Sequence, residues 1–494
     1  MLTNWYMDVN MSAARQQQFL NGCGTASLLL AGLILVTLAT ALSWHAWNLA
    51  ASESTPALGR TTIVVGSLAA GAIFLLSCLG LRQVQPRWML LWILLIGAAC
   101  RLILLPTSPV RDTDYYRYLW DGAVWLHGYN PWQFSPAAVL AGTSGNVPGG
   151  LHRLALQHDK LIRHINHNSL PTIYPPVSDA VFAAAAWLRP FNTMGLKALL
   201  LLFDTGTAIV IALILKRLRL PSLWLLIYWW NPVVINAFAI EAHLDSITLF
   251  FVALFLYLLV CDRAVTAGVA LGLAIGAKFW PIVLAIVVLK KYWAALRRLL
   301  AFALAVSLST LIVLAPMFMT GPPAFQSLSA YAHYWQANDL IFHLLFVLWK
   351  YVLTSWSASH MAGLITVLVV YGVLTLLLLN KPMAGVQPIR TCLWLTTLIF
   401  LLSPTEFPWY YTWLLPMLAV CPRPSLLLWS CTLGLYHLSY VIPQVVWIEH
   451  LPVLLLLILE AFVPSIRLFF ENTPVTPTLM PTSAASGAPE RLGR

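Results

Sequence analysis

Three carboxylates and two arginines fall within residues 111–122 of a chain in which only 9% of residues are charged. Asp112 and Asp114 alternate there, so an extended backbone directs both carboxylates to one side. A carboxyl group that is half-buried beside another has a raised pKa, which suits it to take a proton from a hydroxyl as a general base. The same pair also suits a divalent cation such as Mg²⁺ or Mn²⁺. The residues alone leave both roles open.

The residues after Asp114 have the periodicity of an amphipathic helix that reaches Gly128. At about 100° per residue, one face carries the polar and aromatic side chains Asp114, Arg117, Tyr118, Asp121 and Trp125. We predict that this helix lies flat at the membrane surface and that Arg117, Tyr118 and Asp121 contact the substrate. The alternative is structural, with Asp112 or Thr113 as the N-cap and Asp114 complementing the helix dipole.

Other ionisable residues lie inside or beside apolar runs, where a charge costs roughly 2.5–3.5 kcal/mol on insertion scales. Lys278 interrupts one such run, and we predict that it neutralises a phosphate. His243 and Asp245 follow another run and are predicted to contact the substrate. For Arg101 and Asp204, a buried ion pair competes with a catalytic role.

Two further segments combine aromatic side chains with hydrogen-bonding ones. Residues 335–339 contain Trp335 and Asn338, and residues 404–411 contain Glu406, Trp409 and Tyr410. Aromatic faces stack on the C–H face of a sugar ring while amide and carboxylate groups bind its hydroxyls, so we predict two sugar-binding platforms. The alternative is an aromatic belt at the lipid interface.

The composition indicates an all-α polytopic membrane protein, because 60% of the 494 residues are hydrophobic, against roughly 45–50% apolar usage in soluble domains. The net charge of +11 does not indicate nucleic acid, since the basic residues stand singly or in pairs at the ends of apolar runs. The seven cysteines include no CxxC pair, and we predict neither a disulfide nor a metal site from them.

Charge placement predicts the topology. Residues 1–24 form a cytoplasmic segment, residues 25–467 a domain of about 11–13 transmembrane helices, and residues 468–494 a disordered cytoplasmic tail. Residues 106–172 are the longest polar segment between spans, and a loop of this length is usually functional. We predict that it lies outside, together with residues 317–339 and 403–411. The apolar stretch 264–289 is predicted to form two short legs that meet at Lys278, near the outer face.

Residues 112–122 (DTDYYRYLWDG), with Gly128-Tyr129-Asn130-Pro131 after them, resemble the first-outer-loop signature of bacterial polytopic glycosyltransferases of the GT-C superfamily. The closest similarity is to the mannosyltransferase-like branch that uses polyprenyl-phosphate sugars. Later motifs follow the order of that branch over residues 111–416: Tyr174-Pro175-Pro176, Asn231-Pro232, His243-Leu244-Asp245, Lys278 with Pro281, and Ser403-Pro404 with Pro408-Trp409-Tyr410. The chain departs from the pattern in having two extra spans before the signature loop, where many relatives have one span.

The resemblance implies a GT-C-like helical bundle and an inverting transfer of a sugar, with mannose the expected one, from a polyprenyl-phosphate carrier. The acceptor would be a hydroxyl on a glycan, lipid or protein at the outer face of the bacterial cytoplasmic membrane, and Asp112 or Asp114 would be central to the reaction. The resemblance of the Tyr174-Pro175-Pro176 motif also implies that Tyr174 binds the substrate. The competing interpretation is a transporter or lipid flippase, whose intramembrane charges would serve ion coupling. No internal repeat supports that alternative, and a large acidic outer loop favours an enzyme.

Overall fold

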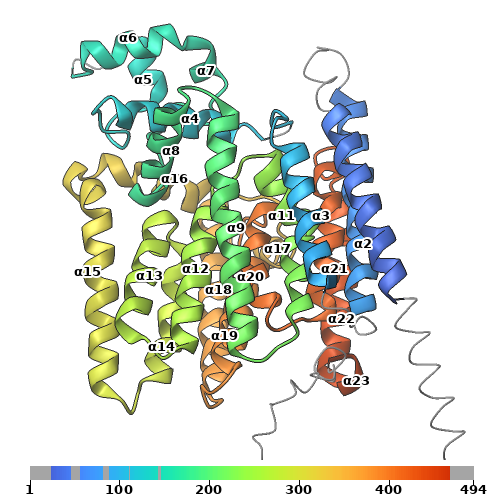
Figure 1. Cartoon of the computed structure of the whole chain (residues 1–494). Coiled ribbons are helices and arrows are strands. Elements are labelled where there is room, and N and C mark those ends of the chain that lie inside the picture. The colour runs from blue at the N-terminus through green and yellow to red at the C-terminus, as the bar shows by residue number, and fades with distance from the viewer. Residues whose placement is uncertain (1–23, 46–55, 82–87, 111, 143–145, 468–494) are drawn as a thin grey trace, which may run out of the picture.

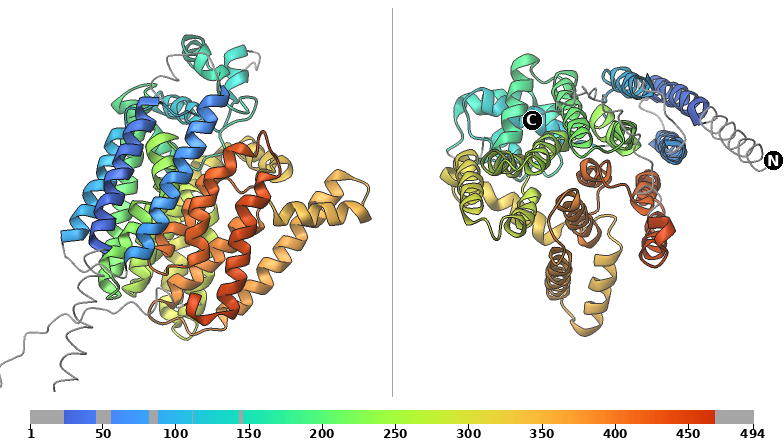
Figure 2. Two further views of the ribbon diagram at one scale, coloured as in Figure 1. Left: turned by 90° about the vertical axis from the view of Figure 1, so that its right-hand side faces the viewer. Right: turned by 60° about the horizontal axis from the view of Figure 1, so that its bottom comes forward.

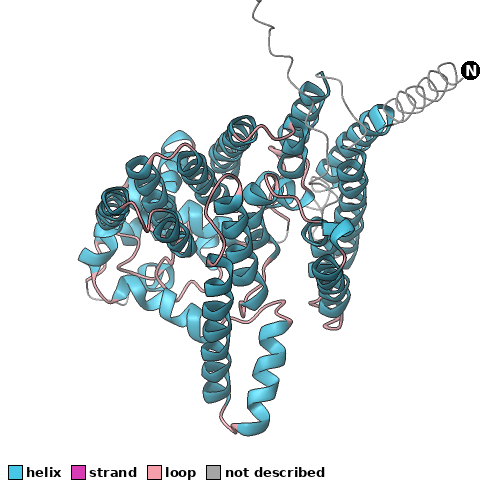
Figure 3. Cartoon of the chain, turned by 90° about the horizontal axis from the view of Figure 1, so that it is seen from below, coloured by secondary structure: helices cyan, strands magenta, loops and turns pink. Residues whose placement is uncertain are grey.

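The computed structural model describes residues 24–45, 56–81, 88–110, 112–142 and 146–467. The predicted cytoplasmic tail and nearly all of the predicted N-terminal segment lie outside these residues. Within them the protein is all-helical, and the regular β pairing is confined to an isolated parallel bridge between Ala337 and Thr405 (Figure 3). The prediction of an all-α fold is confirmed for this part of the chain.

Five helices in the described residues are long and apolar enough to cross a membrane: Gly24–His45, α9 (Thr193–Arg217), α15 (Leu296–Thr320), α18 (Trp356–Leu379) and α22 (Val445–Phe462). A sixth span results if the bent pair Ser222–Trp229 and Pro232–Ile240, with an angle of 50°, counts as one. Shorter apolar helices include α3 (Trp88–Leu104), α12 (Asp245–Val260), α13 (Ala264–Ala277) and α19 (Gln387–Leu402). The chain is therefore a polytopic membrane protein, and the predicted total of 11–13 spans stays a prediction.

The helices run side by side between two ends of the molecule (Figure 1). Further elements of the bundle include α2 (Pro56–Gly80), α10 (Leu226–Trp229), α11 (Pro232–Ile235), α14 (Ala285–Lys291), α20 (Leu415–Leu418), α21 (Pro424–Thr432) and α23 (Pro464–Arg467). The hairpin of α17 (Ile341–Val352) and α18 projects sideways from the bundle (Figure 2).

A buried ion pair joins helices of the bundle core. Arg101 of α3 contacts Asp204 of α9 at 2.5 Å, and both side chains are at most 4% exposed. The Tyr228 hydroxyl also donates to Asp204 at 2.8 Å, and Arg101 donates to the Trp229 carbonyl at 2.8 Å. A buried charge needs partners of this kind, so the structure favours the structural role of Arg101 and Asp204 over the catalytic one.

One end of the bundle carries a layer built mostly from residues 112–188 (Figure 1). It contains α4 (Asp114–Leu126), α5 (Pro136–Ala141), α6 (Gly149–Gln157), α7 (Asp159–Arg163) and α8 (Pro176–Leu188), with α16 (Pro323–Tyr334) beside them. The helix predicted from Asp114 begins there and ends two residues before Gly128. Helix α4 is buried without interruption from Arg117 to Val124, so it presents no free amphipathic face there, and its position at the membrane surface stays a prediction.

The predicted break at Lys278 is confirmed. Helix α13 ends at Ala277, Lys278 is extended, and a short helix η4 (Trp280–Leu284) leads into α14. Pro281 contributes to the interruption, because it has no N–H to donate to the Ala277 carbonyl and its ring would clash with that carbonyl in a continuous helix. Because of the break, the Lys278 side chain does not pack along α13 but points toward the layer of α4 to α8.

Candidate functional site

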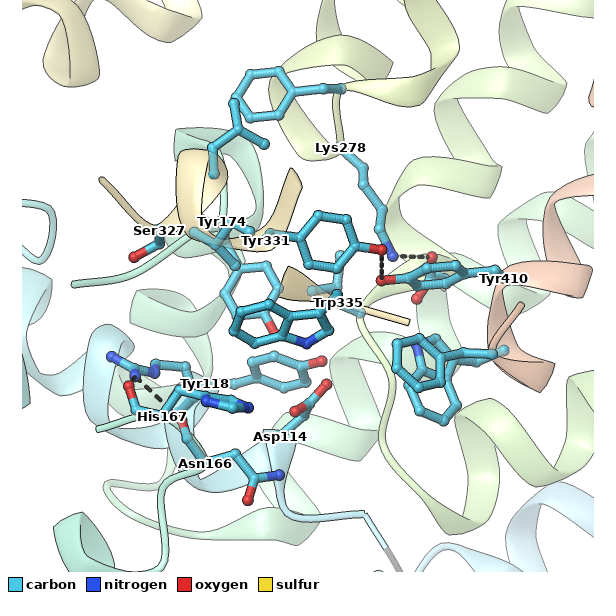
Figure 4. Close-up of a pocket in the computed structure, with 18 of the residues that line it drawn as sticks. Asp114, Tyr118, Asn166, His167, Tyr174, Lys278, Ser327, Tyr331, Trp335 and Tyr410 are labelled. Atoms are coloured by element: carbon cyan, nitrogen blue, oxygen red, sulfur yellow. Dashed lines mark hydrogen bonds and ion pairs between the residues drawn. The ribbon is translucent and has the colours of Figure 1, made fainter. Parts of the chain in front are cut away.

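A cavity of about 450 Å³ lies where the layer of α4 to α8 meets the bundle. Its walls come from α4, the start of α8, the break after α13, α16 and the short helix η5 (Pro408–Leu414) (Figure 4). Most of the substrate-binding and catalytic residues predicted from the sequence line it: Asp112, Asp114, Arg117, Tyr118, Tyr174, Asp245, Lys278, Trp335, Trp409 and Tyr410. Residues more than 290 positions apart in sequence thus share one chamber.

The two acidic residues of the signature segment meet at one wall of this cavity. The Asp112 carboxylate accepts a hydrogen bond from the Asp114 backbone N–H at 2.9 Å. The Asp112 backbone N–H donates to Glu241 at 3.2 Å, and the other Asp112 oxygen lies 3.4 Å from His243 Nε2. Asp112 thus fixes the first turn of α4 while its side chain remains at the cavity. Asp112 can therefore both stabilise the start of α4 and take part in chemistry at the cavity.

Burial raises the pKa of both carboxyl groups, but their neighbours differ. The pKa of Asp112 rises well above its usual range because of burial and the nearby carboxylates of Asp114 and Glu241. Burial raises the pKa of Asp114 to about 6, while Lys278, Arg117 and a hydrogen bond from Tyr118 act in the opposite direction. The neighbouring groups therefore favour ionisation of Asp114 over ionisation of Asp112.

Lys278 supplies a cation on the opposite side of the cavity (Figure 4). Its ammonium group lies 2.7 Å from Asp245 and 4.2 Å from the centre of the Tyr410 ring. Trp413 donates its indole N–H to the same Asp245 oxygen at 2.6 Å. This oxygen therefore accepts hydrogen bonds from both Lys278 and Trp413. This arrangement orients a positive charge toward the chamber without leaving it unpaired in the protein interior.

Aromatic side chains fill much of the remaining wall. The Tyr331 hydroxyl hydrogen-bonds with Thr405 at 2.6 Å and donates to Tyr410 at 3.3 Å. The Trp335 ring lies 5.6 Å from the Tyr331 ring and 4.4 Å from the imidazole of His167. Trp335 projects across the chamber, between the acidic wall and Lys278 (Figure 4). Such rings offer flat apolar faces next to hydroxyl groups, the combination that suits a sugar.

Four predicted substrate-binding residues do not line the cavity in the structure. Asp121 is 1% exposed beneath Arg117, and His243 is 1% exposed with its ring stacked 4.0 Å from Trp409. Asn338 hydrogen-bonds to the Glu406 carbonyl, and Glu406 is fully buried against His450. These side chains contact residues of the cavity wall. Their role in this geometry is to hold the wall in place. The sequence motifs could not distinguish residues that line the cavity from residues that pack behind its walls, because both kinds alternate along the same segments.

Arg117 lines the cavity, but its donors are used within the protein. Its guanidinium donates to the backbone carbonyls of Leu170 at 3.1 Å, His167 at 3.0 Å and Asn166 at 3.4 Å. Three carbonyls of one loop are thereby attached to α4. Arg117 therefore orders the loop of residues 166–170, and Lys278 is the better placed of the two cations for an anionic ligand.

Several lining residues were not predicted as site residues, namely Asn166, His167, Ser327, Tyr331, Trp280, Phe407 and Trp413. For Tyr331 the signal was present, because it stands in the aromatic run before Trp335. For His167 there was none: its backbone has a positive φ of 52°, and only the packed loop brings its ring onto Trp335.

Asp112, Asp114 and His243 could hold a divalent cation. One ligand atom from each lies within 4.8 Å of the others. A cation bound at about 2.0–2.2 Å holds opposite ligands about 4 Å apart, so these residues fit with small side-chain movements. Two carboxylates and an imidazole form a ligand set compatible with Mn²⁺ as well as Mg²⁺. A cation there would offset the charge of an anionic ligand.

Comparison with protein-family models, with curated proteins and with solved structures gives no match. The interpretation of the site therefore rests on the chain's own residues and their geometry.

Proposed function

We propose that this protein is an integral membrane glycosyltransferase. It transfers a sugar, with mannose the expected one, from a polyprenyl-phosphate carrier to an acceptor hydroxyl. The reaction takes place at the outer face of a bacterial cytoplasmic membrane, and the protein has the fold of the GT-C glycosyltransferases that its signature segment resembles. The acceptor is a glycan, a lipid or a protein.

One observation carries the proposal: a single chamber holds the Asp112–Asp114 pair on one side and Lys278 on the other, with aromatic rings between them. Transfer of a sugar from a sugar phosphate needs three groups, arranged in the order in which they occur across this chamber. A base must face the acceptor hydroxyl, a surface must hold the sugar ring, and a cation must face the leaving phosphate. The position of the chamber, between the outer layer and the apolar helices, suits a donor with a lipid tail and a polar head.

The proposed reaction is a single in-line displacement. The acceptor oxygen forms a bond to the anomeric carbon while the bond from that carbon to the phosphate oxygen breaks. The electron pair of the broken bond leaves with the phosphate, whose charge Lys278 offsets, and the acceptor proton moves to a carboxylate of the Asp112–Asp114 pair. Attack from the side opposite the phosphate inverts the anomeric centre. A phosphate leaves without being protonated, so no second acid is needed, unlike in glycoside hydrolases.

The charge balance of the chamber agrees with this mechanism. Three carboxyl groups, Asp112, Asp114 and Asp245, face the chamber together with two cations, Lys278 and Arg117, and Lys278 pairs with Asp245. A phosphodiester adds one more negative charge, which a fully ionised acidic pair would repel. A proton shared by Asp112 and Asp114, or a divalent cation held by them, removes this conflict while leaving an acceptor oxygen for the proton.

A transfer assay tests the proposal. The purified protein, in detergent or in lipid bilayers, is given polyprenyl-phosphate mannose and other lipid-linked sugars together with candidate acceptors, and released polyprenyl phosphate is measured. Release that requires both the protein and an acceptor supports the proposal. A protein that moves the intact lipid-linked sugar between the bilayer leaflets without cleaving it would instead be a flippase.

A further inference from the structure

A second polar cluster lies behind the aromatic wall, and the reaction proposed above does not use it. We call it the latch, and it consists of Asn338, Glu406, Glu449 and His450. Glu406, Glu449 and His450 are each 0% exposed. Glu406 belongs to the turn before η5, Asn338 to the turn after α16, and the other two to α22. The latch thus joins three segments that are distant in sequence.

The central contact of the latch is between His450 and Glu406. His450 Nε2 lies 2.8 Å from a Glu406 carboxylate oxygen, and its Nδ1 lies 2.8 Å from the Val446 carbonyl. A carbonyl only accepts, so Nδ1 carries a proton and Nε2 faces Glu406. One further proton lies between Nε2 and the carboxyl group. Whichever group holds it, the hydrogen bond is retained.

Asn338 connects the two turns to each other and to α22. Its amide donates to the Glu449 carboxylate at 2.7 Å and to the Glu406 carbonyl at 3.2 Å. Beside it, the Ala337 N–H donates to the Pro404 carbonyl at 3.0 Å, and the Glu406 N–H donates to the Ala337 carbonyl at 2.8 Å. Asn338 has a positive φ of 57°, which these contacts hold in place.

The segments that the latch joins carry the aromatic wall. Trp335 lies two residues before Ala337, while Phe407, Trp409 and Tyr410 directly follow Glu406, and all four line the cavity. Two other connections join the sides of the wall: the backbone bonds of Ala337, and Tyr331, which contacts Thr405 and Tyr410. The latch therefore sets the distance between Trp335 and the rings of η5.

We propose that Glu406 and His450 are positioning residues that hold the aromatic wall of the cavity in its binding geometry. They do so by fixing the turns 335–339 and 403–407 to α22. Their effect on sugar transfer rests on the proposed function, whereas their effect on the two turns does not. Glu406 thus acts through the wall and not as a ligand for sugar hydroxyls.

The test measures the latch and the reaction separately. Amide hydrogen exchange at Ala337 and Glu406 reports the two backbone bonds between the turns, and it needs no substrate. We expect exchange at both amides to be at least about tenfold faster in His450→Ala and in Asn338→Ala. Glu406→Gln should stay within about threefold of the natural protein, because the glutamine amide still donates to His450 Nε2. In transfer assays with polyprenyl-phosphate mannose, His450→Ala should raise KM by more than it lowers kcat.

Glu460→Gln is the matched control. Glu460 is a buried carboxyl on the same helix, α22, but it accepts from the Ser425 N–H at 2.6 Å. We expect its substitution to leave exchange at Ala337 and Glu406 unchanged. Unchanged exchange in both His450→Ala and Asn338→Ala would overturn the proposal, and so would an equal acceleration in Glu460→Gln. If the expected exchange pattern is found but the natural protein transfers no sugar, the latch stands and the proposed function fails.

Discussion

Asp112 and Asp114 are two residues apart at the start of α4, but their surroundings differ. Asp112 faces the carboxylates of Glu241 and Asp114, which oppose its ionisation. Asp114 faces Lys278, Arg117 and the Tyr118 hydroxyl, which favour its ionisation. A base must be ionised before the reaction, so the structure ranks Asp114 above Asp112 for this role, a choice that the spacing of the two residues leaves open.

We expect Asp114→Asn to lower the rate of sugar transfer by about 100-fold or more, since a positioned general base contributes about 10²–10⁴ to a rate. Asp112→Asn should have a smaller effect, because its amide can still accept from the Asp114 N–H. Rates with polyprenyl-phosphate mannose measure both. Asp159→Asn is the control, as Asp159 pairs with Arg163 at the surface of the layer of α4 to α8. A larger loss in Asp112→Asn than in Asp114→Asn would reverse the assignment.

The transfer rate should also depend on pH with a defined sign. Since the pKa of Asp114 is raised to about 6, its base form predominates above that pH and is lost as the pH falls through it. We therefore expect the rate to rise with pH and to level off above about 6–7, with an apparent pKa that belongs to the coupled pair. Initial rates between about pH 5 and 8 measure it. A flat profile, or one that falls with rising pH over this range, would contradict ionised Asp114 as the base.

At the scale of elements, the acidic segment depends on how closely α4 approaches α8. A Cβ placed on Gly122 would lie 2.3 Å from the Phe182 carbonyl oxygen of α8. That neighbour is backbone and cannot move aside by a rotamer change, so glycine is required at this crossing. The same contact buries Tyr118, whose ring stacks 4.6 Å from Phe182, and so orients α4 over the cavity.

Gly122→Ala should therefore destabilise the layer of α4 to α8 by about 1–3 kcal/mol, the usual cost of overpacking a tight contact. Thermal unfolding in detergent measures this loss, and limited proteolysis locates it. Gly149→Ala is the control in the same layer, because the nearest atom to its Cβ would be the flexible Arg153 guanidinium at 3.7 Å. Equal stability of the Gly122→Ala variant and the natural protein would show that α4 and α8 are not held this closely.

At the scale of the whole molecule, the proposed function requires the layer of α4 to α8 to face outward. Gln157 on α6 and Lys290 on α14 are both exposed and lie at opposite ends of the bundle (Figure 1). We expect a membrane-impermeant maleimide to label Gln157→Cys in intact cells and Lys290→Cys only after permeabilisation. The parent protein, with its native cysteines, gives the background. Labelling of Lys290→Cys alone in intact cells would invert the topology and rule out an outward-facing site.

Local sequence determined much of the architecture. Apolar composition and run length predicted a polytopic helical protein, because lipid leaves each backbone polar group to be satisfied within its own helix. The start of α4 at Asp114 and the break of α13 at Lys278 were predicted as well, since a change of periodicity and a proline act on adjacent residues. The same local pattern failed for the surroundings of α4, because burial of Arg117 and Asp121 depends on α8 and the loop 166–170.

The sequence by itself singled out the residue types of the site, since charge is costly in an apolar chain and therefore conspicuous wherever it occurs. Only the tertiary structure decided which of these residues face the cavity. In the structure, Asp114 and Lys278 line the chamber. Arg117 donates hydrogen bonds to a loop, and Glu406 is buried behind the wall, where it contacts His450. Lining and supporting side chains have the same chemistry and alternate along the same segments. Their roles differ only in what packs against them, and that is set by contacts between segments far apart in the chain.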